Sequence, residues 1–486
     1  MCTSPHREQV RFGILLYRND GTELLVERAS EGLRLPAVSI PRYSRVAEEL
    51  TGAIERSWDI ETYCLFTLPA GTLGYAVLEA CRQDAGHPAG MCWMPLDSLR
   101  SNAFEDPADL AVIHTSQERL GEHRGKEVPG VFGRPGWLRM VVEWVEAQAA
   151  PAGFHLTGRF RQLNASPTFS LIRFETDGPA LWFKAVGEPN VHEHRVTLKL
   201  AAAFPKFLPR ILASRPEWNA WLSLESEGAP LNSDSSATAW ACAAENLALF
   251  QIGTFGRRFE FIEAGCKDLR PCVLRDLVQP FFGSMTQLME RQTKLSPAPL
   301  SRQELLALGR EIRSALDELE DAGVPNTLGH LDLNAGNMLI SDTRCVFLDW
   351  AEAYVGPPFF SFQYLLEHWR RVHKKGLRNE TSLLACYGKH WTRFATPAQI
   401  ATSFELTALL AAFAYAAGGL AWRNPDVNWR AEKAGYLRGL VRRMKREADE
   451  RRVVTDIFLD VSESDPFHRR NDGGKQRISI GVQKRS

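Results

Sequence analysis

The stretch LGHLDLNAGNMLISDTRCVFLDW, residues 328–350, decides the fold and the chemistry expected of this chain. Two short apolar runs flank a turn, which predicts a β-hairpin. Polar residues interrupt this pattern, among them His330, Asp332, Asn337 and Asp349. Burying a carboxylate among aromatic and aliphatic neighbours is costly unless a positive charge lies against it. The stretch therefore indicates a site at which carboxylates meet a cation.

Transfer of a phosphoryl group from a nucleotide needs the groups that this stretch carries. Metal ions and a cation must neutralise the transferring group, and the acceptor hydroxyl must face a carboxylate. Asp332 lies on a loop, where it can accept the hydroxyl's proton. Asn337 begins one strand and Asp349 ends the antiparallel partner, so both reach the same end of the hairpin. Because Mg²⁺ prefers oxygen ligands, we expect Asn337 and Asp349 to bind it.

The stretch resembles the His-x-Asp-x-x-x-x-Asn and Asp-Trp motifs of the aminoglycoside phosphotransferase and choline kinase-like family, which has a protein-kinase-like fold. His330, Asp332 and Asn337 match the first motif, and Asp349 with the following tryptophan matches the second. The resemblance covers about residues 150–450. It implies that His330 is an orienting residue that hydrogen-bonds the backbone around Asp349.

Such a fold needs a lysine on the third strand of its small lobe and a glutamate on the following helix. Lys184 ends the apolar run ALWFKAVG, and Glu193 lies on the next predicted helix. The resemblance implies that these two residues form an ion pair and that Lys184 binds nucleotide phosphates. It also places the nucleotide base near Leu224, in the connector between the lobes, and the phosphate-covering turn at Ser166 and Thr168.

The sequence departs from the family pattern at three places. A residue that is commonly His in the catalytic loop is Asn334 here, and the sequence does not assign its role. The residues after Asp349 lack the Asp that usually follows the Gly-Pro turn and supports the loop. The turn NASPTFS contains no glycine, so the Gly-rich loop of protein kinases is absent.

Composition and charge exclude several other classes of protein. The 486 residues include 44% hydrophobic and 24% charged residues, which is ordinary for a soluble globular protein of several domains. The formal net charge is zero, so no general field attracts nucleic acid or an anionic membrane. The most apolar segment, residues 406–422, is interrupted by two glycines and falls short of a membrane span, so we expect a buried helix.

The cysteines and the N-terminus favour a cytoplasmic location. Nine scattered cysteines contain no Cys-x-x-Cys pair, so neither a disulfide framework nor a zinc site is predicted. The N-terminal residues carry no apolar signal-peptide region.

The expected fold class is α+β: a bilobal protein-kinase-like fold, with a small antiparallel β-rich lobe and a large helical lobe, preceded by a small α+β domain. The predicted segments are the small domain (1–125), a linker with a connecting helix (126–150), the β-rich lobe (151–226), the helical lobe with the catalytic and metal loops (227–455) and a polar, disordered tail (456–486).

The first domain resembles a Nudix fold in its general pattern of a hairpin, a helix and further strands. Nudix hydrolases ligate Mg²⁺ through an Arg-Glu-x-x-Glu-Glu order on the helix. Glu48, Glu49 and Glu55 are present here without that order. We interpret the domain as degenerate and non-catalytic, serving as a sensor, a lid or the surface of a homodimer.

Three functions follow from these patterns. The first is transfer of the γ-phosphoryl group of ATP or GTP, with Mg²⁺, to a hydroxylated small molecule, without a nucleic-acid or membrane partner. The second is a catalytically weak or inactive nucleotide-binding module, and the third is hydrolysis of a nucleoside diphosphate derivative by the first domain. Glu352 and Glu367 follow the site and would attract a cationic acceptor, unless they form an ordinary solvated surface.

Overall fold

A computed structural model describes residues 8–463, apart from 43, 71–72, 101–102, 124–131, 167, 343, 374–376, 420 and 424–430. The N-terminal seven residues, part of the predicted linker and residues 464–486 of the predicted tail lie outside the described residues. The chain forms two compact units. The first unit comprises Met1–Arg270 and Val324–Thr396, and the second comprises Pro271–Gly323 and Pro397–Ser486.

The first domain is a mixed β-sheet with two helices. Its path of paired strands is β3-β2-β1-β6-β5, with β4 on β1 and β7 on β2, and β1 runs parallel to β6. Helix α1 packs on one face of the sheet. The elements are β1 (Gln9–Arg18), β2 (Glu23–Ala29), β3 (Gly32–Arg34), β4 (Ala37–Pro41), α1 (Val46–Trp58), β5 (Thr62–Ala70), β6 (Leu73–Ala80), β7 (Met91–Pro95) and α2 (Pro107–His123).

The turn between β1 and β2 confirms the predicted hairpin. Asn19, Asp20 and Gly21 have φ values of 53°, 54° and 84°, which Asn, Asp and Gly tolerate best. The expected helix and the later strands of this domain are present too. Its Nudix-like identity stays a prediction.

The small lobe is a five-stranded antiparallel sheet of order β11-β12-β10-β9-β8 with one helix. The antiparallel sheet and the helix after its third strand, both expected from the resemblance, are present. Their bounds are β8 (Leu156–Ser166), β9 (Phe169–Thr176), β10 (Leu181–Val186), α4 (His192–Ala203), β11 (Ile211–Arg215) and β12 (Ala220–Leu224). Since side chains alternate along a strand, Lys184 and Phe183 of β10 point to opposite faces of this sheet.

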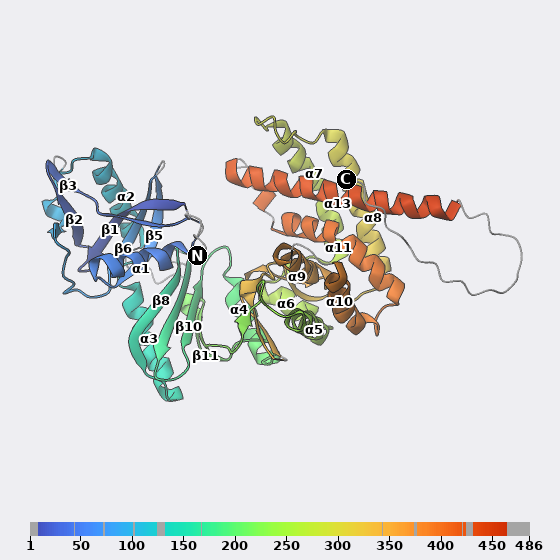
Figure 1. The fold of residues 1–486 in the computed structure, drawn as a ribbon, viewed down its shortest axis with the longest axis horizontal. Helices are drawn as coiled ribbons and strands as arrows, with labels where there is room; N and C mark the ends of the chain where they lie inside the picture. Colours follow the sequence, from blue (N-terminus) through green and yellow to red (C-terminus); the bar gives the residue numbers. More distant parts are fainter. Residues whose placement is uncertain are drawn as a thin grey trace, which may run out of the picture. The chain divides into compact units, whose positions relative to one another are not determined.

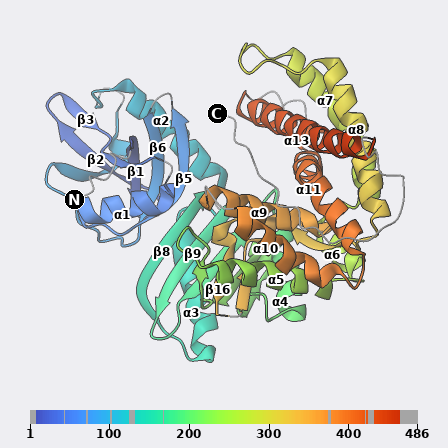
Figure 2. The same ribbon diagram turned by 45° about the vertical axis from the view of Figure 1, so that its right-hand side comes forward.

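A continuous hydrophobic core joins the first domain to the small lobe. Helix α3 (Trp137–Ala149) supplies its centre, and the Trp137 ring lies 6.2 Å from that of Phe183 and 4.8 Å from that of Trp218. Tyr63 and Leu65 of β5 belong to the same core. Helix α3 and the first domain lie beside the sheet of the small lobe (Figure 1; Figure 2). One face of this sheet is therefore buried in the shared core, and Lys184 lies on the opposite face.

The edge strands β5 and β8 of the two sheets are linked by a side chain. Gln162 of β8 is 2% exposed and mimics a strand pair: its Oε1 accepts the Cys64 N–H at 2.7 Å, and its Nε2 donates to the Cys64 carbonyl at 2.7 Å. The pairing of each strand with its own sheet is irregular next to this contact. Gln162 thus satisfies two backbone groups of the first domain that would otherwise be buried without a partner.

Replacing Gln162 by Leu should lower the free energy of unfolding by a few kcal/mol. The leucine keeps the volume but leaves the Cys64 N–H and carbonyl unpaired, which costs roughly 1–3 kcal/mol for each buried group. Chemical denaturation followed by tryptophan fluorescence measures the change. The same substitution at Gln9, an exposed residue of β1, is the control and should change little. Equal stability of the two variants would contradict the role given to Gln162.

The rest of the first unit contains the predicted hairpin and helices around it. The hairpin is β16 (Met338–Ser341) and β17 (Arg344–Phe347), and β15 (Thr327–His330) pairs with β18 (Ala353–Gly356). The other elements are β13 (Ala229–Pro230), α5 (Ala237–Gly253), α6 (Arg258–Ala264), β14 (Lys267–Asp268), α9 (Phe359–Val372) and α10 (Leu377–Gly388). Short 3-10 turns of this unit lie at Leu96–Ser98, Ala150–Ala152, Pro216–Trp218, Ala335–Asn337, Trp350–Glu352 and Lys389–Trp391.

The second unit is helical. It consists of α7 (Pro271–Glu290), α8 (Arg302–Asp321), α11 (Pro397–Gly418) and α13 (Ala431–Glu463), with a 3-10 turn at Ala421–Arg423. By length and composition α11 could cross a membrane, but 67% of its most apolar window is buried inside the structure. The apolar helix begins before the expected residue 406 and ends at Gly418, because the Gly418-Gly419 pair favours a helix end.

The structure has the predicted α+β, kinase-like fold. It consists of the antiparallel sheet of the small lobe, the helix α4 after its third strand and the mainly helical part of the chain that follows β12. The division of the chain at the predicted domain boundaries stays a prediction.

Candidate active site

A cleft of about 790 Å³ lies in the first unit, on the Lys184 face of the small lobe's sheet. This volume is within the roughly 300–1,000 Å³ typical of small-molecule sites. The lining comes from the sheet, from the connector after β12 and from the β16–β17 hairpin, and one residue comes from the first domain. Its polar and aromatic members include Arg45, Asn164, Phe169, Trp182, Lys184, Trp221, Glu225, Asn337, Asp349 and Trp350.

Lys184 is held between two carboxylates. Its Nζ lies 2.5 Å from Glu193 Oε1 and 2.8 Å from Asp349 Oδ1. Glu193 is 1% exposed, whereas the Asp349 side chain is 42% exposed and faces the cleft. The ion pair expected between Lys184 and Glu193 is present, and Asp349 is a second partner that the sequence did not predict. The positive charge inferred beside the hairpin is therefore Lys184.

Lys184 stabilises the charges of both carboxylates, and the two carboxylates stabilise the charge of Lys184. Burial lowers the pKa of Lys184, but the charges of Glu193 and Asp349 outweigh it and raise this pKa above its ordinary value. Burial raises the pKa of Asp349, but Lys184 outweighs it and holds this pKa below its ordinary value. Burial raises the pKa of Glu193, and Lys184 offsets only part of that rise. Asp349 is therefore a carboxylate at neutral pH and can meet a cation in the cleft.

Asp349 is placed by an unusual backbone conformation. Its φ and ψ are 61° and 68°, in the left-handed region that Asp and Asn tolerate better than most side chains. The register Met338↔Phe347 and the bond from the Leu348 N–H to the Asn337 carbonyl, 2.9 Å, bring the hairpin's two ends together. Asn337 and Asp349 therefore lie at the same end of the hairpin, as predicted.

His330 links the catalytic loop to the residue before Asp349. It is 1% exposed, and its Nδ1 accepts the Asp332 N–H at 3.0 Å. Its Nε2 must then carry the proton, which it donates to the Leu348 carbonyl at 3.0 Å. Burial lowers the pKa of His330, so the ring stays neutral. These contacts fit the orienting role predicted for His330, and they leave no free ring nitrogen for acid or base chemistry.

Asn334, which the sequence left unassigned, orients Asp332. Its Oδ1 accepts the Gly336 N–H at 2.9 Å and caps the 3-10 turn, so its Nδ2 faces Asp332 Oδ1 at 3.0 Å. Asp332 is exposed and is not among the residues that line the cleft. The sequence contained a signal for this role of Asn334, because an Asn two residues before a Gly is typical of an Asx turn or helix cap.

Asn337 has a fixed amide. Its Nδ2 donates to the Asp332 carbonyl at 2.8 Å, so Oδ1 remains available to a ligand. Asp349 likewise uses Oδ1 for Lys184. Asn337 Oδ1 and the second carboxylate oxygen of Asp349 lie at the same end of the hairpin and suit Mg²⁺. This ion commonly takes one or two protein ligands and completes its coordination shell with phosphate and water. Among the described residues no group of three His, Cys, Asp or Glu side chains could hold a metal, so such an ion would need the nucleotide's oxygens as well.

The residues predicted to contact the nucleotide do not all line the cleft. Leu224 lines the cleft beside the connector, as expected. Ser166 and Thr168 do not: the Thr168 N–H donates to Ser166 Oγ at 3.1 Å, and the two hydroxyl oxygens lie 3.3 Å apart. The lining instead includes Asn164 and Phe169, which flank that turn. Binding of phosphates by Ser166 and Thr168 stays a prediction that these contacts do not favour.

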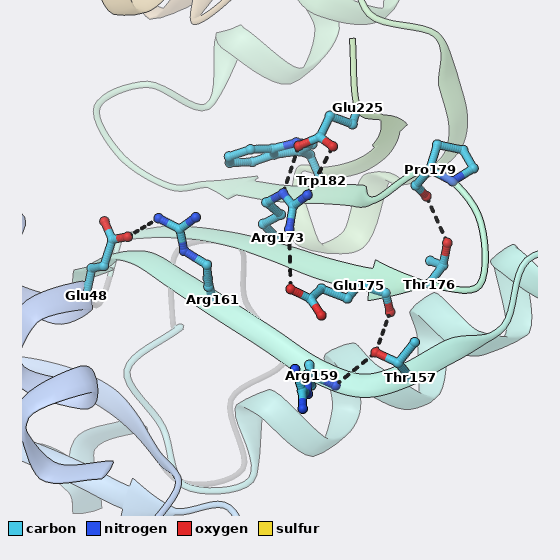
Figure 3. A network of polar contacts seen from close by, with 10 residues as sticks. All are labelled: Glu48, Thr157, Arg159, Arg161, Arg173, Glu175, Thr176, Pro179, Trp182 and Glu225. Carbon is cyan, nitrogen blue, oxygen red and sulfur yellow. Dashed lines mark hydrogen bonds and ion pairs between the residues drawn. The ribbon is translucent and has the colours of Figure 1, made fainter. Parts of the chain in front are cut away.

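Polar contacts fix the connector at the mouth of the cleft. Arg173 of β9 forms two hydrogen bonds with Glu225, of 2.7 and 3.0 Å, and Trp182 Nε1 donates to the same carboxylate at 3.3 Å (Figure 3). Arg161 of β8 is the cross-strand neighbour of Arg173 and pairs with Glu48 of the first domain. The connector and the first domain are thus joined to neighbouring strands of the same sheet.

The two carboxylates considered for a cationic acceptor already have partners. Glu352 forms an ion pair with Lys267, and Glu367 accepts a hydrogen bond of 3.0 Å from Gln363 Nε2. The charge of Glu352 is therefore largely compensated within the protein.

Part of the chain is similar to a known protein family. Residues 272–396 match the model of the phosphotransferase enzyme family. No curated protein matches the chain. Similar solved structures include a macrolide 2'-phosphotransferase from Brachybacterium faecium, which is 18% identical over 61% of this chain and 97% of that chain, with a TM-score of 0.40. A choline kinase from Cryptosporidium parvum Iowa II is 11% identical over 67% and 99% of the two chains, with a TM-score of 0.44. An ethanolamine kinase from Plasmodium vivax is 12% identical over 71% and 91%, with a TM-score of 0.41.

Proposed function

We propose, from the premise that residues 272–396 belong to the phosphotransferase enzyme family, that this chain transfers the γ-phosphoryl group of ATP or GTP to a hydroxyl of a small molecule. One observation carries the proposal: Lys184 is buried in the wall of the cleft, held at once by Glu193 and Asp349. A buried ammonium with two carboxylates is costly to maintain for stability alone, and it suits a site that receives phosphates and a metal ion.

The residues divide into a nucleotide side and an acceptor side. Lys184 and the cleft lining bind the nucleotide, whose base lies at the connector near Leu224. Asn337 Oδ1 and Asp349 would hold Mg²⁺, which when bound neutralises charge on the phosphate oxygens. Asp332 lies outside the lining of the cleft and is exposed, where an acceptor hydroxyl can approach it.

Asp332 accepts the proton of the acceptor hydroxyl in this proposal. Asn334 Nδ2 holds one carboxylate oxygen of Asp332, and the hydrogen bond from the Asp332 N–H to His330 Nδ1 fixes the main chain. The other oxygen, Oδ2, accepts a long hydrogen bond of 3.5 Å from Asn337 Nδ2, which leaves it able to orient the hydroxyl toward the phosphoryl group. His330 takes no part in proton transfer, because both ring nitrogens are engaged with the backbone.

The first domain has no catalytic role in this proposal. Glu48, one of its three helix carboxylates, is paired with Arg161. No metal-holding cluster of acidic residues occurs among the residues that the structure describes. We place the reaction in the cytoplasm, a proposal supported by eight described cysteines that are all free thiols.

A direct assay tests the proposal. Purified protein is incubated with Mg²⁺, ATP or GTP and a panel of hydroxylated acceptors that includes aminoglycosides, macrolides, choline and ethanolamine, and phosphorylated product is identified by mass spectrometry. We expect one class to be phosphorylated and stoichiometric nucleoside diphosphate to form. Nucleotide binding without any product from the panel would favour the inactive-module alternative. Absence of Mg²⁺-dependent nucleotide binding would refute the proposal.

A further inference from the structure

The cleft contains two cations, and their surroundings differ. Lys184 is paired with Glu193 and Asp349. Arg45 also lines the cleft, although it belongs to the first domain, and it is exposed. The Arg45 carbonyl accepts the Glu49 N–H at 3.0 Å, but the Arg45 side chain has no hydrogen-bond or ion-pair partner among the residues that the structure describes. It is therefore a cation in the lining whose charge the described protein does not compensate.

The position of Arg45 is set by a well-anchored helix. Arg45 precedes α1, with φ −75° and ψ 102°, and its side chain is not used to cap the helix. One turn later, Glu48 forms an ion pair with Arg161 of β8, as Figure 3 shows. Helix α1 packs along β8, the strand whose Leu163 and Asn164 also line the cleft. The start of α1 is thus held beside the end of β8 that enters the cleft.

The joint between the domains keeps this arrangement. Gln162 pairs with both backbone groups of Cys64, and Tyr63 OH lies 3.1 Å from Ser170 Oγ. Trp137 Nε1 donates to the same Ser170 oxygen at 3.3 Å, within the core that both domains share. These contacts are buried, so the first domain is packed firmly against the small lobe and the backbone of Arg45 is held beside the cleft.

The turn between β8 and β9 leaves a need for such a cation. It has no glycine that would bring backbone N–H groups close to phosphates, and its two hydroxyl side chains bind each other. The carboxylates in the lining are Glu225, Glu227 and Asp349. Glu225 is paired with Arg173, but the charge of Lys184 is already shared between Glu193 and Asp349. A polyphosphate in this cleft would therefore be stabilised by a further cation in addition to Lys184 and Mg²⁺.

We propose that Arg45 binds the phosphate oxygens of the nucleotide, so that the first domain completes the nucleotide site of the kinase-like fold. The inference rests on the proposed function, because it assumes that the cleft binds a nucleoside triphosphate. The Arg45 guanidinium, a fork of N–H donors, matches phosphate geometry. The first domain is then a component of the active site rather than a separate sensor.

Calorimetric titration of the full chain with ATP, ADP and adenosine, in Mg²⁺, tests this inference. Arg45→Ala should weaken ATP and ADP binding about tenfold or more, since it removes charge-assisted hydrogen bonds, and should leave adenosine binding unchanged. Arg45→Lys should restore part of the loss. Arg56→Ala is the matched control, because Arg56 is an exposed arginine of the same helix that does not line the cleft.

The possible outcomes separate this inference from the proposed function. Equal affinity of the wild type and Arg45→Ala for ADP overturns the role of Arg45 and leaves the proposed function standing. An equal loss for ADP and adenosine also overturns it, because the variant would then have disturbed the cleft rather than a phosphate contact. If Arg45→Ala raises the KM for the acceptor and leaves ATP affinity unchanged, Arg45 contacts the acceptor, and its proposed role in phosphate binding is also overturned. If the wild type binds neither ATP nor ADP, the proposed function and this inference fail together.

Discussion

The variant Asp332→Asn should reduce the turnover number for phosphoryl transfer by about 10²–10⁴-fold, the range typical of losing a positioned general base. The introduced asparagine keeps the shape of the side chain and can still accept the hydrogen bond from Asn334, so the loop should keep its structure. What it cannot do is accept the hydroxyl proton. Because Asp332 does not line the cleft, the dissociation constant for Mg²⁺-ATP should stay within about twofold of the wild type.

Steady-state kinetics with the acceptor found in the screen, together with calorimetry for the nucleotide, measures both quantities. Asp342→Asn is the control. Asp342 is exposed, lies in the turn of the same hairpin and has a positive φ of 31°, which Asn tolerates. This control should retain full activity. If Asp332→Asn kept more than half of the wild-type turnover number, the acceptor-side role of Asp332 would be wrong.

The sequence predicted the local geometry of this site because its motif lies on one hairpin. Asn337 and Asp349 are brought together by strand pairing alone, and alternating apolar residues set that register. The ion pair between Lys184 and Glu193 was implied by the family resemblance, and the two residues lie on a strand and on the helix that follows it. Contacts between residues that are close in the chain can be predicted from periodic patterns of apolar residues in the sequence.

Contacts between distant segments left no such pattern. Gln162 and Cys64 are separated by 98 residues, and an isolated Gln in a strand carries no sign that it pairs with another sheet. Arg45 reaches the cleft only because α1 packs along β8, which depends on the shared core around Trp137. The sequence therefore predicted a separate first domain, whereas the structure joins that domain to the small lobe through buried contacts.

A second large effect is expected from Asp349→Asn, which should make nucleotide binding independent of Mg²⁺. The carboxylate is the one negatively charged ligand among the two predicted metal ligands, and an amide in its place binds Mg²⁺ weakly. The loss of several kcal/mol of electrostatic stabilisation corresponds to about a thousandfold or greater fall in turnover. Asn also tolerates the left-handed backbone at this position, φ 61°, where Ala would add strain, so the fold should persist.

Titration of ADP in Mg²⁺ and again in EDTA measures the effect. For the wild type, Mg²⁺ should tighten ADP binding, and for Asp349→Asn the two dissociation constants should coincide, because Lys184 still binds phosphate while the metal no longer contributes. Asp268→Asn is the matched control: Asp268 also forms an ion pair, with Arg270 at 2.7 Å, but does not line the cleft. A Mg²⁺ effect of wild-type size in Asp349→Asn would mean that Asp349 serves only to hold Lys184. Other oxygens would then have to bind the metal. The assignment of Asp349 to the metal and of Asp332 to the acceptor would be wrong.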